Sequence, residues 1–519
     1  MYLTQAVKRS AQINADGIAT ICAGRERTWT QTQDRIARLA GAMQGLGFGR
    51  GDRAAILALN SDRYFEFYYA VPWAGGVFVP VNIRLAAPEV EFWLTDSGAT
   101  FLFVDDQFLP VWEALKDRGT DVKHVVYIGD GELPEGLLDY EQLISEAAPV
   151  ADADRGYEDL AGLFYTGGTT GRSKGVMLSH RNLVMNSFNV FPSFGFEHGM
   201  RWLHAAPMFH IADGCATFGV TAMAGVHVFI PAFSPDATLQ AIQDHQIGHT
   251  LLVPTMVNMV VNAPNSSDFD LSSLKYVTYG ASPMPEAVII KAMEVMPACG
   301  FNHAYGQTEC APLVTSTGPE FHVLEGPNAG RFKSAGRAVP GVELKVADEE
   351  GNEVPRGKIG EICSRGPHVM QGYWKRPDLT AEAIKNGWMH SGDAGYMDEQ
   401  GFIFIVDRVK DMIISGGENI YSAEVENALY QHSAVVECAV IGIPDDRWGE
   451  AVHAVVRCHV GQSVDGDALI AHCRELIAGF KCPRSISFRE EPMPLSGAGK
   501  ILKTDLRKPF WEGKAKAVN

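Results

Sequence analysis

The sequence predicts an α/β protein in which helices cover mostly parallel sheets, followed by a small β-rich subdomain and a small α+β domain. Three features of the 519 residues indicate this. Helical and β-rich patterns alternate over most of the chain. From about residue 336 to 405 the pattern is strand-rich and interrupted by glycines, and after Lys410 a new α+β pattern begins. We therefore expect one domain over 1–409, with the β-rich subdomain at about 336–405, and a second over 410–519.

The first elements have a β–α–β order. Thr30 and Gln33 have the spacing of a capping box, and apolar residues at helical intervals then predict a helix that ends at Gly47. "RAAILAL" (53–59) predicts a buried strand, "SDRYFEFYYAVPWAGG" a helix and "VFVPVN" a further strand. Because this order recurs along the chain, we expect parallel strands joined by helices.

Composition narrows the class of partner. The chain has 44 Lys and Arg against 62 Asp and Glu, a formal charge of −18, which disfavours nucleic acid and anionic lipid as main partners. Its nine cysteines include no C-x-x-C pair, which is typical of a reduced, cytoplasmic protein. The N-terminus resembles no secretory signal. Residues 215–233 approach the length of a membrane span but contain His227 and Pro231, so we expect a buried helix and a strand there and no transmembrane segment. The sequence is compatible with a monomer and with a homo-oligomer.

A glycine-rich stretch, "YTGGTTGRSKG" (165–175), is the first candidate site. It is neither a Walker loop, since Lys174 precedes Gly175, nor a dinucleotide-binding fingerprint. Its glycines let backbone amides approach an anion, and four hydroxyl side chains add donors. The sequence therefore predicts a phosphate-binding loop; the alternative is an ordinary glycine-rich surface turn.

Three more motifs follow in order: "HAYGQTEC" (303–310), "MHSGDAGYMDEQGFIFIVDRVKD" (389–411) and "PLSGAGKILKTDLRK" (494–508). Together with the loop they resemble the adenylate-forming superfamily of acyl-CoA synthetases, luciferases and peptide-synthetase adenylation domains, over essentially the whole chain. Two positions depart from the family pattern. Ser173 stands where proline is common, and Ala304 stands where aryl-acid ligases often have glycine, which argues against a flat aromatic pocket.

The resemblance implies an ATP site. In it the loop binds the β- and γ-phosphates, Thr308 bonds the α-phosphate, and Asp393 accepts both ribose hydroxyls. The implied ATP- and AMP-binding residues are Thr166, Gly167, Gly168, Thr169, Thr170, Gly171, Lys174, Gly280, Ala281, Ser282, His303, Ala304, Tyr305, Gly306, Thr308, Asp393 and Arg408. Glu309, with Thr166, would coordinate Mg²⁺, a hard cation suited to oxygen ligands. Without the motifs, Glu309 would be a surface acid and Asp393 a turn residue.

The resemblance also implies three groups with roles outside the nucleotide pocket. Lys500 would stabilise the charge that develops on the α-phosphate, and the alternative is a solvated lysine in a flexible tail. Lys410 would be the hinge of a mobile C-terminal domain, and Gly416 and Gly417 would border the coenzyme A tunnel. A turn glycine that needs positive φ is the simpler explanation for Gly417.

The acyl pocket is expected around His210, Tyr279 and Gly280. His210 would gate the pocket or orient the carboxylate, with a satisfied core histidine as the alternative. The walls expected at 208–214, 253–259 and 279–281 are mostly apolar, which favours a fatty or aryl acid over an amino acid. Asp213 lies nearby but in a different context from an ammonium-binding aspartate.

We therefore predict an ATP-dependent acyl-CoA synthetase that uses ATP, Mg²⁺ and coenzyme A to activate an apolar acid. As substrates we rank medium- or long-chain fatty acids ahead of phenylpropanoid-type acids. The alternatives are an adenylating enzyme that loads a carrier protein, although no carrier segment follows Lys508, a luciferase-like oxygenase and a catalytically silent nucleotide-binding regulator. Glu309, Asp393, Arg408 and Lys500 together disfavour the last.

Overall fold

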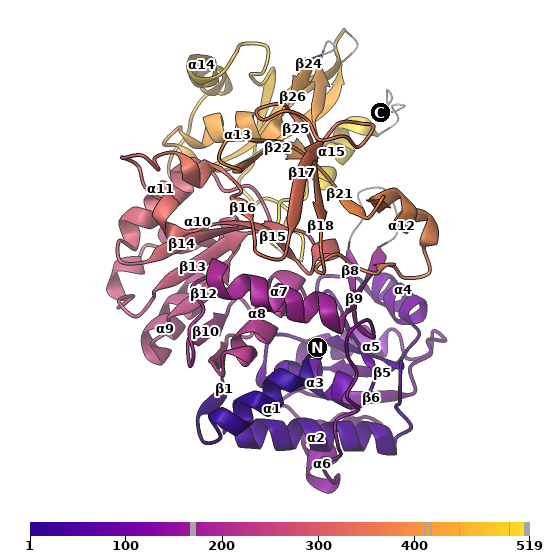
Figure 1. The fold of residues 1–519 in the computed structure, drawn as a ribbon. Coiled ribbons are helices and arrows are strands. Elements are labelled where there is room, and N and C mark those ends of the chain that lie inside the picture. Colours follow the sequence, from indigo (N-terminus) through magenta and orange to yellow (C-terminus); the bar gives the residue numbers. More distant parts are fainter. Residues whose placement is uncertain (167–172, 409–410, 416–417, 446, 498, 513–519) are drawn as a thin grey trace.

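The computed structural model describes residues 1–166, 173–408, 411–415, 418–445, 447–497 and 499–512. Two large sheets covered by helices form the lower part of the molecule, and two smaller sheets lie above them (Figure 1). This is the α/β architecture that the alternating pattern predicts.

The first large sheet has nine strands in the order β16-β15-β14-β13-β12-β10-β11-β1-β2. Its strands are β1 (Ile18–Cys22), β2 (Arg25–Thr28), β10 (Arg201–His204), β11 (Val226–Phe229), β12 (His249–Leu252), β13 (Tyr276–Gly280), β14 (Gly300–Gly306), β15 (Leu313–Thr317) and β16 (Arg337–Ala338). The strands from β14 through β12 and β11 to β1 pair in parallel. The carboxyl ends of β13 and β14 therefore lie side by side, which brings two predicted binding segments together.

The second large sheet has eight strands in the order β19-β9-β8-β4-β3-β5-β6-β7. Its strands are β3 (Arg53–Leu57), β4 (Val77–Pro80), β5 (Ala99–Val104), β6 (His124–Tyr127), β7 (Leu138–Asp139), β8 (Leu160–Thr166), β9 (Lys174–Ser179) and β19 (Gly372–Tyr373). The antiparallel pair β8–β9 flanks the glycine-rich loop. Strand β19 then adds residues far along the chain to the edge beside that loop.

Helices join and cover these sheets (Figure 1). They are α1 (Thr4–Ile13), α2 (Trp29–Gly45), α3 (Asp62–Trp73), α4 (Ala87–Ser97), α5 (Leu109–Glu113), α6 (Tyr140–Glu146), α7 (His180–Ser193), α8 (Ile211–Ala222), α9 (Pro235–His245), α10 (Pro254–Val261) and α11 (Glu286–Val295). Every residue of α3 is buried, because this helix lies inside the core and not on its surface. Its buried charges are paired, for example Asp62 with Arg25 and Glu66 with Arg35.

Helices α2 and α8 lie in segments for which the sequence made specific predictions. The capping box of α2 is made by Thr28 and Gln31, so the prediction of Thr30 and Gln33 was two residues late. Both pairs have the same spacing, and Thr28 takes the role because it is the last residue of β2, where the chain turns into α2. Residues 215–233 form most of α8 and then β11, as expected. Within the described residues, no helix has the length and apolar character needed to cross a bilayer.

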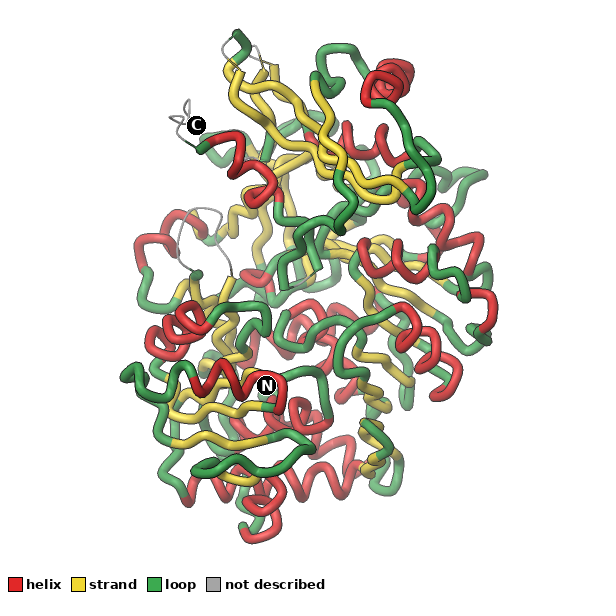
Figure 2. The backbone as a smooth tube through the Cα atoms, turned by 180° about the vertical axis from the view of Figure 1, so that it is seen from behind, coloured by secondary structure: helices red, strands yellow, loops and turns green. Residues whose placement is uncertain are grey.

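The third sheet is the β-rich region. It contains β17 (Glu343–Ala347), β18 (Gly360–Arg365), β20 (Ile384–Lys385), β21 (Trp388–Met397) and β22 (Ile403–Arg408), all antiparallel, with α12 (Pro377–Ala383) beside it. The fourth sheet contains β23 (Ile413–Ser415), β24 (Glu418–Ile420), β25 (Val435–Asp445), β26 (Gly449–Cys458) and β27 (Ser485–Phe488). Helices α13 (Ser422–Tyr430), α14 (Gly466–Leu476) and α15 (Lys503–Trp511) accompany it, and the view from behind shows this last unit at one end of the molecule (Figure 2). It has an apolar core of its own, which includes Ile413, Leu429 and Val440.

Candidate functional site

The stem of the glycine-rich loop is an antiparallel pair of strands. Thr166 at the end of β8 lies opposite Lys174 at the start of β9. Tyr165 anchors the stem, because its ring stacks on Trp93 with 4.7 Å between centroids and its hydroxyl donates to Asp96 at 2.6 Å. The predicted phosphate ligands Gly167, Gly168, Thr169, Thr170 and Gly171 lie outside the described residues.

Glu309 lies beside this stem. It belongs to a short 3₁₀ turn, Thr308–Cys310, and is 9% exposed. The Tyr373 hydroxyl donates to Glu309 Oε1 at 2.8 Å, and the Lys174 ammonium lies 4.5 Å from the centroid of the Tyr373 ring. Burial, together with the charge of Glu309, raises the pKa of Tyr373, so its hydroxyl stays protonated and remains a donor. Tyr373 thus connects the loop stem to the "YGQTE" segment, a role that sequence analysis did not foresee.

A second cluster surrounds Asp393, which is 7% exposed on β21. The Tyr305 hydroxyl donates to Asp393 Oδ2 at 2.8 Å, and Asp393 faces Arg408 across the β21–β22 pair. The pKa of Tyr305 is raised well above its usual value by burial and by the Asp393 carboxylate, so Tyr305 also remains a donor. The structure therefore brings together predicted nucleotide ligands from two motifs, Tyr305 from 303–310 and Asp393 from 389–411, with the backbone of Arg408 paired to that of Asp393. The side chain of Arg408 is not among the described groups.

Strands β13 and β14 pair side by side, and their ends carry the residues predicted to lie near the adenine. Gly280 pairs with Ala304, and Tyr279 pairs with His303. A Cβ at Gly280 would lie 2.1 Å from the carbonyl oxygen of Ala304, so only glycine fits this approach. The chain then leaves the strand through Ala281 with φ of 69° and continues to Ser282, while Gly306 ends β14.

Tyr279 itself is part of the core. Its ring stacks on His303 at 4.8 Å, and its hydroxyl lies 2.9 Å from His322 Nε2. Burial lowers the pKa of His303 to about 4, so this ring is neutral at pH 7. The Tyr279 side chain is fully buried, so its contacts are with the core residues His303 and His322.

His210 and Lys500 lie near one another. His210 is the N-cap of α8, where its Nδ1 accepts the amide hydrogen of Ala212 at 3.2 Å. Burial and the positive charge of Lys500 lower the pKa of His210 to about 3, so the imidazole is neutral. An Nδ1 that accepts a hydrogen bond places the ring hydrogen on Nε2. His210 is thus the N-cap of α8, a structural role that the sequence analysis did not name, and it is also a neutral donor within reach of the charge of Lys500.

The loop that carries Lys500 is docked on the large domain. Thr255 Oγ1 donates to the carbonyl of Gly499 at 2.8 Å, and Arg84 donates to that of Leu495 at 2.9 Å. Inside the loop, Ser496 Oγ accepts from the amide of Lys500 at 3.1 Å. These contacts show that part of the expected pocket wall at 253–259 is a docking surface for the loop. Met259, at the end of this wall, is 46% exposed.

Asp213 faces the core. Its Oδ2 lies 2.6 Å from His204 Nδ1, and His204 Nε2 lies 2.9 Å from His227 Nδ1. All three side chains are fully buried. Because this carboxylate is buried and contacts His204, it is not placed like an aspartate that binds the ammonium of an amino acid.

A buried polar network joins β22 to the C-terminal helices. Asp407 Oδ2 accepts from the amide and the hydroxyl of Ser422, at 2.6 and 2.9 Å. The Lys503 ammonium donates to Ser422 Oγ at 2.7 Å and pairs with Glu426 at 2.7 Å. This network spans the predicted boundary at Lys410, which, like Gly416 and Gly417, lies outside the described residues.

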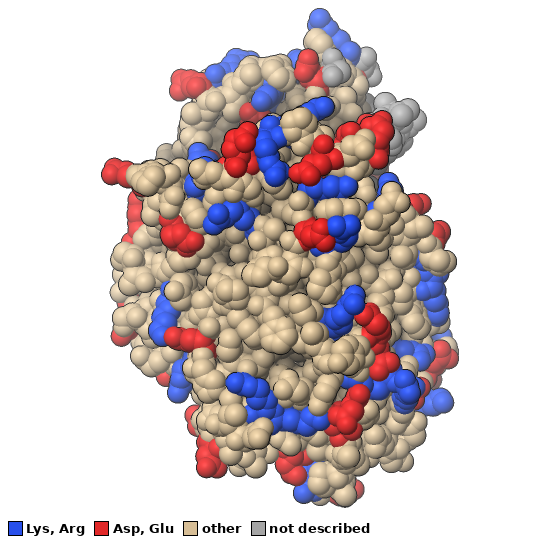
Figure 3. Space-filling view, in the orientation of Figure 1, with Lys and Arg blue, Asp and Glu red and all other residues tan. Residues whose placement is uncertain are grey.

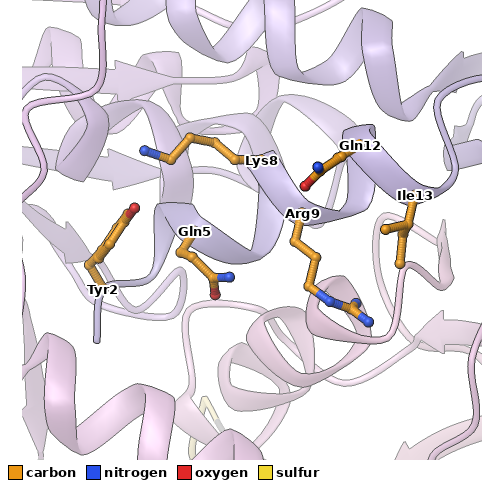
Figure 4. Close-up of a pocket in the computed structure, with 6 residues that line it drawn as sticks. All are labelled: Tyr2, Gln5, Lys8, Arg9, Gln12 and Ile13. Atoms are coloured by element: carbon orange, nitrogen blue, oxygen red, sulfur yellow. The ribbon is translucent and has the colours of Figure 1, made fainter.

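Two surface features lie away from these clusters. A shallow hollow beside α1 is lined by Tyr2, Gln5, Lys8, Arg9, Gln12 and Ile13 (Figure 4). None of these is a predicted site residue. On the face seen in Figure 3, acidic and basic side chains are interspersed and form no single basic patch among the described residues.

The fold and these clusters define an enzyme class that activates a carboxylic acid with ATP. Residues 7–374 match the AMP-binding enzyme family, and residues 424–500 match the AMP-binding enzyme C-terminal domain. The chain belongs to this family, and it is an AMP-forming acid–thiol ligase.

Relatives cover nearly the whole chain. A feruloyl-CoA synthase of Amycolatopsis sp is 39% identical over 503 residues, which are 97% of this chain and 98% of the relative. A fatty acid–[acyl-carrier-protein] ligase of Streptomyces coeruleorubidus is 36% identical over 100% of this chain and 98% of its own. The crystal structure of an anthranilate CoA ligase in complex with anthranoyl-AMP superposes with a TM-score of 0.90 at 26% identity, covering 98% of this chain and 97% of that one.

Proposed function

We propose that this ligase joins an apolar carboxylic acid to coenzyme A in two half-reactions at the site around Lys500. In the first, a carboxylate oxygen attacks the α-phosphorus of ATP, the bond to the β-phosphate oxygen breaks, and diphosphate leaves. In the second, the coenzyme A thiolate attacks the acyl carbon and AMP leaves. The observation that carries the proposal is the docking of the Lys500 loop on the large domain, where the positive charge of Lys500 acts on neutral His210.

Each cluster has a separate task in the first half-reaction. Lys174 and the loop stem bind the outer phosphates, and Thr308 bonds the α-phosphate. Asp393, held by Tyr305, orients the ribose. Nε2–H of His210 donates to the acid and orients its carboxylate, while the Lys500 ammonium stabilises negative charge on the phosphoryl oxygens. The acid itself lies against the apolar residues near Met208 and Gly280.

The residues around Glu309 fit Mg²⁺. One carboxylate oxygen accepts from Tyr373, no described residue donates to the other, and Thr166 adds a hydroxyl at the adjoining strand end. Carboxylate and hydroxyl oxygens are ligands that Mg²⁺ prefers, with phosphate oxygens and water completing its shell. When bound there, Mg²⁺ neutralises charge on the phosphates.

The class of acid is part of the proposal. Similarity to a feruloyl-CoA synthase and to an anthranilate CoA ligase supports an aryl or phenylpropanoid-type acid. We place that class first and a medium- or long-chain fatty acid second, which reverses the order that the sequence alone favoured. The fatty acid–carrier-protein ligase supports a carrier thiol as the second candidate acceptor.

The cellular compartment also belongs to the proposal. All nine cysteines are free thiols, and seven of them are buried. Free thiols are stable in a reducing compartment, which supports a cytoplasmic location.

The experiment that tests the proposal is a panel of acids. Ferulate, cinnamate, octanoate and palmitate are each incubated with Mg·ATP, with and without coenzyme A, and diphosphate and thioester are measured by mass spectrometry. We expect a thioester only when coenzyme A is present, with the largest kcat/KM for a phenylpropanoid acid. A larger value for octanoate or palmitate would reverse the order of substrates. Acyl-AMP without any thioester would favour a carrier acceptor.

Replacement of Glu309 by Gln is expected to raise the Mg²⁺ concentration needed for half-maximal adenylation and to lower the rate at fixed Mg²⁺, because a neutral amide is a poorer ligand for a hard dication. The measurement is diphosphate release during a Mg²⁺ titration. Glu320→Gln, an exposed acid of the same region, is the matched control. Normal turnover of the Glu309 variant at low Mg²⁺ would remove the metal role.

A further inference from the structure

The strand that carries Asp393 is irregular at that residue. Between the paired positions Cys363–His390 and Glu361–Ala394, two steps along β18 match four steps along β21. The extra residues lie within 391–393, where Gly392 has φ of 73°. Such a conformation favours glycine, and a bulge of this kind turns the next side chain away from its regular direction. The bulge therefore determines where the Asp393 carboxylate points.

Glu361 spans this bulge with both oxygens. Its Oε1 accepts the amide hydrogen of Gly392 at 2.9 Å, and its Oε2 lies 2.7 Å from His390 Nδ1. The side chain of His390 is 11% exposed and that of Glu361 is 29% exposed, so the contact with His390 is partly buried, whereas the contact with the Gly392 amide lies at the surface. A charged acceptor on a backbone amide is one of the stronger hydrogen bonds in proteins. Glu361 thus holds the residue before the bulge and the residue directly before Asp393.

Other contacts fix different parts of the same element. Tyr305 fixes one carboxylate oxygen of Asp393, and Ser391 Oγ accepts from the amide of Asp393 at 3.0 Å. Glu361 differs from both, because it lies on the neighbouring strand β18 and accepts a hydrogen bond from a backbone amide of the bulge, that of Gly392. Glu361 therefore fixes the course of the backbone through the bulge from a second strand, which the contacts of Tyr305 and Ser391 do not do.

We propose that Glu361 is a positioning residue that holds the 391–393 bulge so that Asp393 meets the ribose hydroxyls of ATP. The inference rests on the proposed function, because it assumes that Asp393 binds the ribose. Glu361 contacts no substrate. Its effect reaches the reaction through the direction of one carboxylate, so it matters only for a nucleotide that carries ribose hydroxyls.

The test compares ATP with 2′,3′-dideoxy-ATP in the diphosphate-release assay. The wild type should prefer ATP. In Glu361→Ala we expect kcat/KM for ATP to fall about 10- to 100-fold, the cost typical of a misplaced group, while kcat/KM for the dideoxy nucleotide stays unchanged. The preference for ATP should shrink by the same factor. Glu361→Gln keeps an acceptor for Gly392 and should retain most of the preference. Glu343→Gln, on the adjacent strand β17, is the control.

An unchanged preference for ATP would overturn the inference. Equal losses with both nucleotides would assign Glu361 a general structural role, and no loss with either would show that Glu361 does not position Asp393. Asp393→Ala separates this failure from that of the proposed function. If Asp393→Ala keeps the preference for ATP, the ribose role of Asp393 is wrong and the inference fails with it. If that variant loses the preference and Glu361→Ala does not, only the inference fails. Should Glu361→Ala not fold, His390→Ala removes one of the two anchors and supports the same comparison.

Discussion

Lys500→Ala is expected to lower the rate of acyl-AMP formation by about 100- to 1000-fold, the usual cost of losing one preorganised group that stabilises charge in the transition state. Transfer of the acyl group from pre-made acyl-AMP to coenzyme A should be largely unchanged. The reason is that negative charge develops on the phosphoryl oxygens in the first half-reaction, whereas the second breaks a bond at the acyl carbon. The two rates are measured separately, the first by diphosphate release and the second by thioester formation from synthetic acyl-AMP.

The position of the Lys500 loop makes this comparison selective. The loop is held by backbone contacts, from Thr255 to Gly499 and from Arg84 to Leu495, which the alanine change leaves in place. Lys508→Ala, an exposed lysine of α15, is the control for loss of a positive charge in the same region. Equal losses in both half-reactions would show that Lys500 supports the fold or both steps, and its assignment to adenylation would be wrong.

The order of motifs predicted much of the fold and part of the site. Alternating helical and β-rich runs predicted the two large sheets, because burial periodicity is a local property of the sequence. Thr166, Glu309 and Asp393 were named from their motifs, and the structure places each in a cluster with a residue of another segment. What the motifs did not contain is the partner that holds each of them.

Tyr373 and Glu361 show why these partners were missed. Tyr373 reaches Glu309 because β19 pairs with β9, a contact between strands almost 200 residues apart that no local pattern records. Glu361 contacts Gly392 because two strands pair across a bulge, and a bulge depends on register, not on composition. The capping box of α2 was placed two residues late for a related reason, since two pairs had equal spacing and only the end of β2 distinguishes them.

The second large effect is expected at the domain boundary. In the arrangement seen here Lys500 lies by His210, and the Asp407–Ser422–Lys503 network joins β22 to α13 and α15. We infer that the 410–519 domain must leave this arrangement before the thiol can reach the acyl carbon, with Lys410 as the hinge and Gly417 at the edge of the tunnel. Rotation about Lys410 would separate Asp407 from Ser422, so these contacts belong to the adenylating arrangement.

Lys410→Pro is therefore expected to spare acyl-AMP formation and to slow transfer to coenzyme A by about 100-fold or more, because proline fixes φ near −65° and an incompletely rotated domain misplaces the thiol. Gly417→Leu should do the same by obstructing the tunnel. Lys410→Ala separates loss of the side chain from restriction of the backbone. Gly479→Leu, at a position where an added Cβ meets no atom within 4 Å, controls for a bulky residue in the same domain.

The comparison depends on folded variants, because leucine at position 417 can also strain a turn. Thermal unfolding of each variant is measured beside both half-reactions. A folded Lys410→Pro protein that makes thioester at the wild-type rate would show that domain rotation does not limit the second half-reaction. If both folded variants made thioester normally, the hinge and tunnel roles would both be wrong, and one static site would have to serve both steps. Selective loss of transfer in both variants, with Lys410→Ala and Gly479→Leu active, would instead show that adenylation and thioester formation need different arrangements of the same chain.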